Sequence, residues 1–231
     1  MNKHIYYDKG NNTCYVSLNN YVNELYEGIM PDKTIRDIQN SIEKELEYKQ
    51  LQLNLLSKCN DICEYNNNSN CSMPIGSINS DIMIINTKPD EFELGTTCSM
   101  TKPNNFLLPY LIKFMKIDYY CTDIVKCNNC KDVRQCASNY LLQEINIVNP
   151  KLIIFNGMDS FNMAKNVILN NKFFSKDGIY YGNIYSIDNI NFIIVYDTQK
   201  IFDENNSSIQ VRQKELWNQL LIVKKFLEDK K

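Results

Sequence analysis

The sequence predicts an α/β domain with three layers, helix–sheet–helix, around a mainly parallel central sheet. Four short apolar runs, typical of strands buried on both faces, lie at residues 81–86, 120–125, 151–157 and 191–197. Segments with helical spacing separate these runs, and alternating strands and helices are typical of α/β domains. With 231 residues, 44% of them hydrophobic, the chain is long enough to bury one such core.

Residues 1–32 predict a hairpin appendage outside the main domain. The segments HIYYD and TCYVSL alternate apolar and polar residues around the turn-forming DKGNN. A helix is expected from Asp32, a good N-cap, because apolar residues then recur every three or four positions, at Ile35, Ile38, Ile42 and Leu46. Residues 66–80 are rich in Asn and Ser and indicate a loop. We therefore expect two parts, 1–32 and 33–231.

The remaining helices are expected between and after the strands. Helical spacing of apolar residues occurs at residues 106–117, 139–148, 160–170 and 211–227. In α/β sheets the ligand site lies at the carboxyl ends of the parallel strands. Those ends fall here at residues 86–90, 123–127, 156–157 and 197–198.

The charge balance limits the possible partners. Lys and Arg number 25 against 27 Asp and Glu, so a net charge of -2 excludes a uniformly basic, histone-like protein. Asn, Ile, Lys and Tyr are heavily used and Arg is rare, which indicates AT-rich coding and hence an AT-rich microbe or virus. No apolar run reaches the roughly 18 residues of a transmembrane helix, and the N-terminus lacks the apolar core of a signal peptide. We expect a cytoplasmic protein, or one in the host-cell cytoplasm if viral, without a membrane partner.

Nine cysteines are many for such a chain, and an odd number argues against a fully paired disulfide framework. Cys59, Cys63 and Cys71 form one group along the sequence. A second group contains Cys121, Cys127, Cys130 and Cys136. Two groups separated by a long stretch of folded sequence are typical of a metal or cluster site on which two loops converge.

Five segments together resemble the iron–sulfur uracil-DNA glycosylases, the family-4 type of that superfamily. They are KCNDIC (58–63), DIMIINTKPDEFELG (81–95), YCTDIVKC (120–127), QCASNYLLQEINIVNPKLIIFNG (135–157) and NFIIVYDTQKIF (191–202). The resemblance covers residues 45–228 by order and spacing, and its most specific part is the segment from Cys136 through Pro150 and Lys151 into the next strand. It implies the three-layer fold of that superfamily.

The chain departs from the family where the chemistry occurs. The family's Gly-Glu-Ala-Pro-Gly loop falls on residues 86–90, of which only Pro89 is kept, and the Asn that reads uracil falls on Asp123. The family's His falls on Asp197, while the chain's one histidine is His4. An ionised Asp only accepts hydrogen bonds and repels a departing uracil anion. Loss of one such donor typically costs about 100- to 1000-fold in rate, so we expect that uracil excision is lost.

The same resemblance implies a [4Fe-4S] cluster held by Cys59, Cys63, Cys127 and Cys136. Cys71 and Cys130 are the alternate ligands, because the spacings differ from those of the family. Tetrahedral thiolate ligation also suits zinc, so Zn is the competing metal. The third interpretation is a set of buried cysteines without metal.

Asp90, Asp123 and Asp197 are the candidate catalytic residues, as an acidic cluster that reads an amino-bearing base or binds a metal. The alternative, which we favour, is solvated carboxylates left at a decayed site. Lys88, Lys126, Lys200 and Arg212 are the candidate DNA contacts, although the same four positions could equally be ordinary surface residues.

Two functions remain. One is a DNA-binding or assembly subunit that docks a protein partner through its N-terminal region, and the other is an active glycosylase of altered base specificity in base-excision repair or modified-DNA metabolism. Because every family position for catalysis has changed, the first is favoured.

Overall fold

A computed structural model describes the protein at residues 5–8, 13–16, 31–62, 71–89, 103–127, 130, 132–169, 178–203 and 208–230. The chain divides into two compact units, Met1–Gln50 and Leu51–Lys231. Helix α2 (Asp32–Ile62) contributes to both units, because the division falls within it. Among the described helices, none is long and apolar enough to cross a membrane.

The first unit contains the hairpin that the alternating sequence pattern predicts. Strand β1 (Ile5–Asp8) pairs with strand β2 (Thr13–Val16) in antiparallel register, with Ile5 opposite Val16. Helix α2 then begins at Asp32, as predicted, but the Ile35 amide donates to the Pro31 carbonyl, so Pro31 and not Asp32 occupies the N-cap position.

The second unit is built on a six-stranded sheet in the order β3-β5-β4-β6-β8-β7. The strands are β3 (Ile75–Gly76), β4 (Ile82–Asn86), β5 (Tyr119–Asp123), β6 (Leu152–Asn156), β7 (Ile184–Ile187) and β8 (Ile190–Val195). The four inner strands β5, β4, β6 and β8 are parallel, whereas the edge strands β3 and β7 are antiparallel to their neighbours. The sheet is therefore mixed, which corrects the prediction of a mainly parallel sheet.

The edge turns explain why the sheet is mixed. Strands β7 and β8 are joined by Asp188 and Asn189, both of positive φ (47° and 68°), and a connection of two residues can join only antiparallel strands. At the other edge, Gly76 has a φ of 99°, and a Cβ at this position would lie 2.0 Å from the Tyr119 carbonyl oxygen. Only glycine therefore allows β3 to approach β5 so closely.

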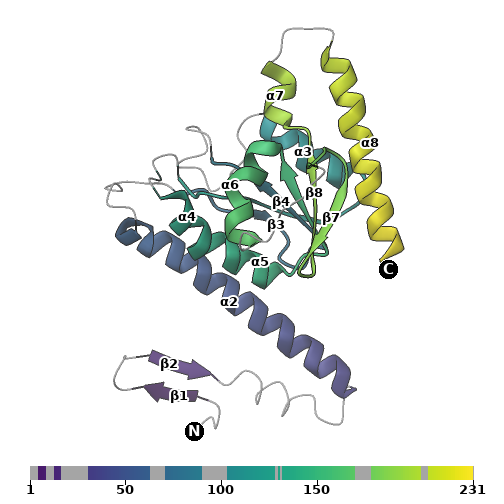
Figure 1. The fold of residues 1–231 in the computed structure, drawn as a ribbon. Coiled ribbons are helices and arrows are strands. Elements are labelled where there is room, and N and C mark those ends of the chain that lie inside the picture. Colours follow the sequence, from purple (N-terminus) through teal and green to yellow (C-terminus); the bar gives the residue numbers. More distant parts are fainter. Residues whose placement is uncertain are drawn as a thin grey trace. The chain divides into compact units, whose positions relative to one another are not determined.

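Helices cover both faces of the sheet (Figure 1). Helices α3 (Pro103–Phe114), α7 (Thr198–Asp203) and α8 (Ser208–Asp229) pack on one face. The other face carries α4 (Val133–Cys136), the π-helical segment η1 (Ala137–Leu141), α5 (Leu142–Val148) and α6 (Met158–Ile168). The predicted three-layer arrangement is thus present in the second unit.

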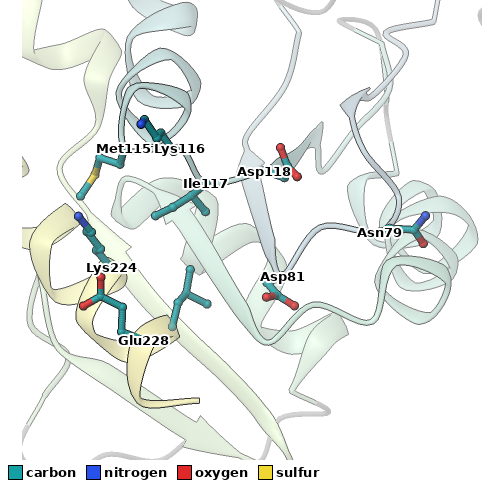
Figure 2. Close-up of a pocket in the computed structure, with 9 residues that line it drawn as sticks. Asn79, Asp81, Met115, Lys116, Ile117, Asp118, Lys224 and Glu228 are labelled. Atoms are coloured by element: carbon teal, nitrogen blue, oxygen red, sulfur yellow. The ribbon is translucent and has the colours of Figure 1, made fainter. Parts of the chain in front are cut away.

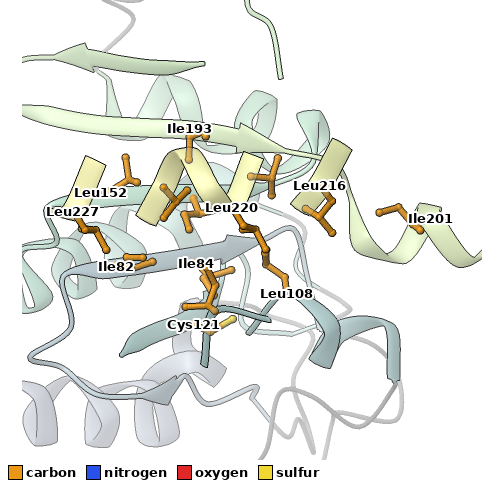
Figure 3. Close-up of a cluster of buried hydrophobic side chains, with 14 residues drawn as sticks. Ile82, Ile84, Leu108, Cys121, Leu152, Ile193, Ile201, Leu216, Leu220 and Leu227 are labelled. Carbon is orange, nitrogen blue, oxygen red and sulfur yellow. The ribbon is translucent and has the colours of Figure 1, made fainter. Parts of the chain in front are cut away.

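The core forms because the inner strands are apolar on both sides. On the side of α3 and α8, Ile82 and Ile84 pack with Leu216 and Leu220 (Figure 3). On the α6 side, the ring of Phe161 lies 5.4 Å from the rings of both Phe155 and Phe192. Residues 82–85 of β4 are all fully buried, as expected for an inner strand.

The helical stretch that follows Cys130 is wider than an ordinary helix at its centre. Asp132 caps α4 by accepting the Gln135 amide at 2.9 Å, and η1 continues α4 into α5. Such single π turns are rare and occur within α-helices. Along this stretch Cys136, Tyr140 and Glu144, which are four residues apart, are all buried.

Candidate functional site at the carboxyl ends of the parallel strands

The four parallel strands end at one edge of the sheet and bring polar residues together there. Asn86 at the end of β4 lies opposite Asp123 at the end of β5, and Asn156 at the end of β6 lies opposite Val195 of β8. Asp197 and Thr198 come two and three residues after the end of β8. The predicted strand-end residues, apart from Asp90, which lies outside the described residues, thus come from neighbouring strands.

A chain of hydrogen bonds links these strand ends. The Asn156 amide nitrogen donates to Asn86 Oδ1 at 2.9 Å and to Thr198 Oγ1 at 3.1 Å. Asn156 Oδ1 accepts from the Thr198 amide at 3.1 Å. The Asn86 amide in turn points to the Cys121 sulfur at 3.5 Å. The two asparagine side chains therefore bond mainly to neighbouring strands.

Asp123 is held as a buried hydrogen-bond acceptor. Its side chain is 3% exposed, and its Oδ2 accepts from the Ser72 hydroxyl at 2.7 Å. The same segment is fixed by the Ser72 amide, which donates to the Lys126 carbonyl at 2.7 Å. Asp123 is therefore fixed by the segment before β3, and it is not one of the solvated carboxylates that the sequence analysis favoured.

Lys126 does not lie on the surface, so the prediction that it contacts DNA is wrong. The residue is 0% exposed, and its Nζ donates to both carboxylate oxygens of Glu144 at 2.8 Å. It also donates to the Thr122 hydroxyl and, at 2.9 Å, to the Asp123 carbonyl. A buried lysine needs such a partner because an isolated charge is strongly disfavoured away from water.

Asp197, half-buried, packs against the turn that follows β6. Gly157 in this turn has a φ of 90°, and a Cβ there would lie 2.7 Å from the Asp197 Cβ. The Gly157 amide donates to the Val195 carbonyl at 3.0 Å. The close approach of the β6 and β8 ends therefore requires glycine.

The other predicted basic residues lie near this edge with different exposure. Lys200 pairs with Asp159 at 2.6 Å, and both side chains are about 60% exposed. The hydrogen bond to Asp159, with the charges of Asp159 and Asp197, raises the pKa of Lys200. Lys88 is exposed and Arg212 is half-buried.

An open hollow of about 490 Å³ adjoins the strand ends. Its lining comes from Thr87 and Lys88 after β4, and from Asp159, Asn162 and Met163 of α6. A second cavity, of about 320 Å³, is lined by Asp81, Asp118, Lys224 and Glu228, at the opposite edge of the sheet (Figure 2). Because ligands of such sheets bind at the carboxyl ends of the strands, the first hollow belongs to the candidate site.

Three of the predicted metal-ligand candidates lie close together beside this site. Burial raises the pKa of the Cys136 thiol, while a hydrogen bond from the Lys126 amide and one with Cys130 oppose this rise. Cys127 is buried and near enough for its charge to act on Cys136. In the described part of the chain, no three Cys, His, Asp or Glu side chains form a group that could hold a metal ion.

The remaining cysteine candidates come from the first sequence group. Cys71 is buried and its thiol points to the Leu55 carbonyl at 4.0 Å. Cys59 belongs to α2, but its side chain lies outside the described residues, as does all of Cys63. Thiols are the soft donors that iron–sulfur clusters and zinc prefer, but the described cysteines alone do not form a metal site, and two of the four predicted ligands, Cys59 and Cys63, lie outside the described side chains.

Sequence reasoning missed Ser72 and Glu144, and it placed Asn86 and Asn156 at the strand ends without giving either side chain a role. Glu144 carries a recognisable signal, because it is an acidic residue on the buried side of a helix that also holds Tyr140 and Val148. The two asparagines each end an apolar strand, which is where ligand-facing groups of such sheets gather. Ser72 has no signal, since it lies in a polar loop.

Comparison with protein families gives one match, over residues 73–224. The matching model is described as the uracil DNA glycosylase superfamily, and the match covers about two thirds of the chain, from the start of β3 into α8. No curated protein matches the sequence.

Proposed function

The chain belongs to the uracil DNA glycosylase superfamily, and we propose that it is a DNA-binding or assembly subunit that keeps this fold and has lost uracil excision. The observation that carries the proposal is the bonding of the strand ends to one another. The Asn156 amide is engaged by Asn86 and Thr198. Excision needs groups that face a flipped base and stabilise its anion, and this amide instead bonds to strand β4 and to the first residue of helix α7.

The two carboxylates at the strand ends support the loss of uracil excision. Asp123 is buried and Asp197 is half-buried, and both stand where the resemblance expects hydrogen-bond donors. An ionised carboxylate accepts but does not donate, so it opposes both uracil O4 and the uracil anion. Both carboxylates therefore disfavour the excision of uracil.

One observation favours the alternative, an active glycosylase of altered base specificity. The Asp123 carboxylate is fixed by the Ser72 hydroxyl at 2.7 Å, and a fixed acceptor suits an amino-bearing base such as cytosine or adenine. In that alternative Asp123 reads the base, and Asp90 or Asp123 positions water.

DNA contact in this proposal falls on Lys88, Lys200 and Arg212 at the strand-end edge. Lys126 is excluded from this set by its ion pair with Glu144. Lys88 lines the hollow and is exposed, the Lys200 side chain is 59% exposed, and Arg212 is partly exposed. The protein partner of an assembly role would bind the N-terminal hairpin and α2.

The thiols beside Cys136 support a bound [4Fe-4S] cluster, with zinc as the competing metal. Cys59, Cys63, Cys127 and Cys136 would hold it, with Cys71 and Cys130 as alternates. Such a cluster can transfer one electron, or it can act only as a crosslink between loops. The residues of the chain contribute the thiol donors and the buried surroundings of Cys127 and Cys136.

The proposal is tested by incubating the purified protein with single- and double-stranded oligonucleotides that carry one uracil. We expect no abasic sites above background, with an active superfamily enzyme as positive control. Parallel oligonucleotides with cytosine- and adenine-type modified bases test the alternative. Robust uracil release that Asp123→Ala abolishes would overturn the proposal.

A further inference from the structure

Two tyrosine rings are stacked next to the strand-end site. The centroids of Tyr181 and Tyr196 are 4.6 Å apart and the rings are 14° from parallel. Tyr196 follows β8 directly, and Tyr181 lies just before β7. Because β7 runs antiparallel to β8, both tyrosines lie at the carboxyl end of β8, beside Asp197.

Helix α8 holds this ring pair in place. The Tyr196 amide donates to Oε1 of Gln219 at 3.0 Å, and Gln219 is 6% exposed. Gly182 has a φ of 80°, its amide donates to the Ile194 carbonyl at 2.9 Å, and a Cβ there would lie 3.0 Å from the Gln219 side chain. Burial raises the pKa of the Tyr196 hydroxyl, and the hydrogen bond that this hydroxyl donates to Glu215 adds to the rise. The two rings are therefore fixed before any ligand arrives.

The outer part of the pair is accessible. Tyr181 is 37% exposed and the adjacent Tyr180 is 60% exposed. The Tyr180 backbone is fixed, since its amide donates to the Tyr185 hydroxyl at 2.8 Å. A large, rigid aromatic surface thus reaches solvent at the edge of the sheet.

The charges near the rings are mixed. Lys200 lies near Tyr181, and Arg212 lies near Tyr196. Asp159, Asp197 and Glu215 oppose them. Lys200 can exchange Asp159 for another anion at little cost, because both partners of this pair are about 60% exposed and exposed ion pairs contribute little.

We propose that Tyr181, backed by Tyr196, is a stacking platform for an unpaired base of single-stranded DNA, with Lys200 contacting the adjacent phosphate. Aromatic side chains bind bases of any sequence through their faces, and this is a common way of binding single strands. A balanced local charge gives little attraction for a duplex, whereas stacking does not depend on net charge. The inference rests on the proposed DNA-binding function and names the strand form and the contact.

The test uses the full chain and a fluorescent oligonucleotide of mixed sequence, as a single strand and as the matched duplex, over a range of salt concentrations. Tyr181→Leu removes the ring and keeps an apolar side chain. Tyr181→Phe keeps the ring. Tyr110→Leu, at a 66% exposed tyrosine of α3, is the control. Thermal melting is recorded for every variant.

We expect Tyr181→Leu to weaken single-strand binding by about 5- to 150-fold, the range for loss of one base–aromatic stack. The salt dependence should be unchanged, because no phosphate contact is lost. The affinity of Tyr181→Leu for the duplex should be close to that of the wild type. Tyr181→Phe and the control Tyr110→Leu should bind both forms of DNA with affinities close to the wild type. Lys200→Gln should instead make DNA affinity less dependent on salt concentration.

Two results overturn the platform while leaving the proposed function intact. One is a wild type that binds single strands and a Tyr181→Leu variant that binds them equally well. The other is a Tyr181→Leu variant that loses single-strand and duplex binding equally and melts at a lower temperature. This result would show that the ring pair stabilises the fold and does not bind a base. If the wild type binds neither form even at low salt, the DNA-binding proposal fails and the platform fails with it.

Discussion

The Lys126 ammonium lies 2.8 Å from both carboxylate oxygens of Glu144, and the two side chains are 1% and 2% exposed. This ion pair joins the loop after β5 to helix α5. Thr122 completes it, because its hydroxyl donates to Glu144 at 2.9 Å and accepts from Lys126. The loop that carries Asp123 and Cys127 is therefore fixed from inside the protein.

Lys126→Met should destabilise the protein by about 3–5 kcal/mol, because it leaves the Glu144 carboxylate buried without its partner. The double variant Lys126→Met/Glu144→Leu removes both charges and should recover most of the loss. Chemical denaturation of the two variants and the wild type measures these differences. A single variant as stable as the wild type would contradict the buried ion pair.

The fold could be predicted well where strands are buried on both faces. The predicted run 151–157 is observed as Leu152–Asn156, because an uninterrupted apolar segment beside a Pro and a Gly has few alternatives. The run 120–125 overshoots β5, which ends at Asp123. Ile124 and Val125 are apolar and buried as well, but the Ile124 amide bonds to Asn86, the last residue of β4, and the Val125 amide bonds to Thr87, beyond the end of that strand. The apolar pattern of the sequence does not distinguish a residue of a buried strand from a buried residue just beyond its end.

Gly157→Ala should be strongly destabilising. The residue has a φ of 90°, and the new Cβ would lie 2.7 Å from the Asp197 Cβ, so backbone strain and a steric clash add. Gly178→Ala is the matched control, because Gly178 has a similar φ of 82° but its nearest neighbour would be 3.6 Å away. We expect Gly178→Ala to lower the free energy of unfolding by about 1–3 kcal/mol, from backbone strain alone, and Gly157→Ala to lower it by more. Equal losses in thermal or chemical unfolding would show that Asp197 does not approach this turn.

The protein purified without oxygen should be brown and contain about four irons per chain, as expected for thiols on converging loops. Cys136→Ala should release the metal and lower the melting temperature, because ligation would crosslink the segment of Cys59 to that of Cys127. Cys121→Ala is the control, since Cys121 lies in β5 within the apolar core. Iron and zinc analysis with the visible spectrum measures the outcome. Stoichiometric zinc without iron would contradict the cluster, and unchanged metal in Cys136→Ala would contradict the ligand assignment.

The candidate site could be located from the sequence, but its chemistry could not be read residue by residue. Asp123 and Lys126 lie three residues apart in one predicted loop. The structure buries both, and the lysine is neutralised by Glu144, which is 18 residues further along the chain. The helical pattern indicates that Glu144 lies on the buried side of its helix, but no local pattern predicts that its partner is a lysine 18 residues earlier in the chain.

DNA binding should be salt-sensitive and should depend on Lys88, Lys200 and Arg212. A chain of net charge -2 has no general attraction for phosphates, so only a local group of cations can supply it. Three phosphate contacts predict that affinity falls roughly 20- to 40-fold between 50 and 200 mM salt. The triple charge reversal to Glu should abolish retention of DNA. The melting temperature should change little, because Lys88 and Lys200 are exposed, Arg212 is partly exposed, and surface substitutions rarely alter stability much.

The matched control for this charge reversal is the triple variant Lys113→Glu, Lys224→Glu and Lys225→Glu, which changes the same charge on exposed residues of α3 and α8. Both triple variants carry the same net charge, so a general electrostatic effect would weaken binding equally in the two. Loss in the strand-end variant alone locates the phosphate contacts beside Asp159 and Asp197. Equal loss would show that binding is unspecific. If the wild type retains no DNA at low salt, a protein-binding role through the hairpin and α2 becomes the better interpretation of this fold.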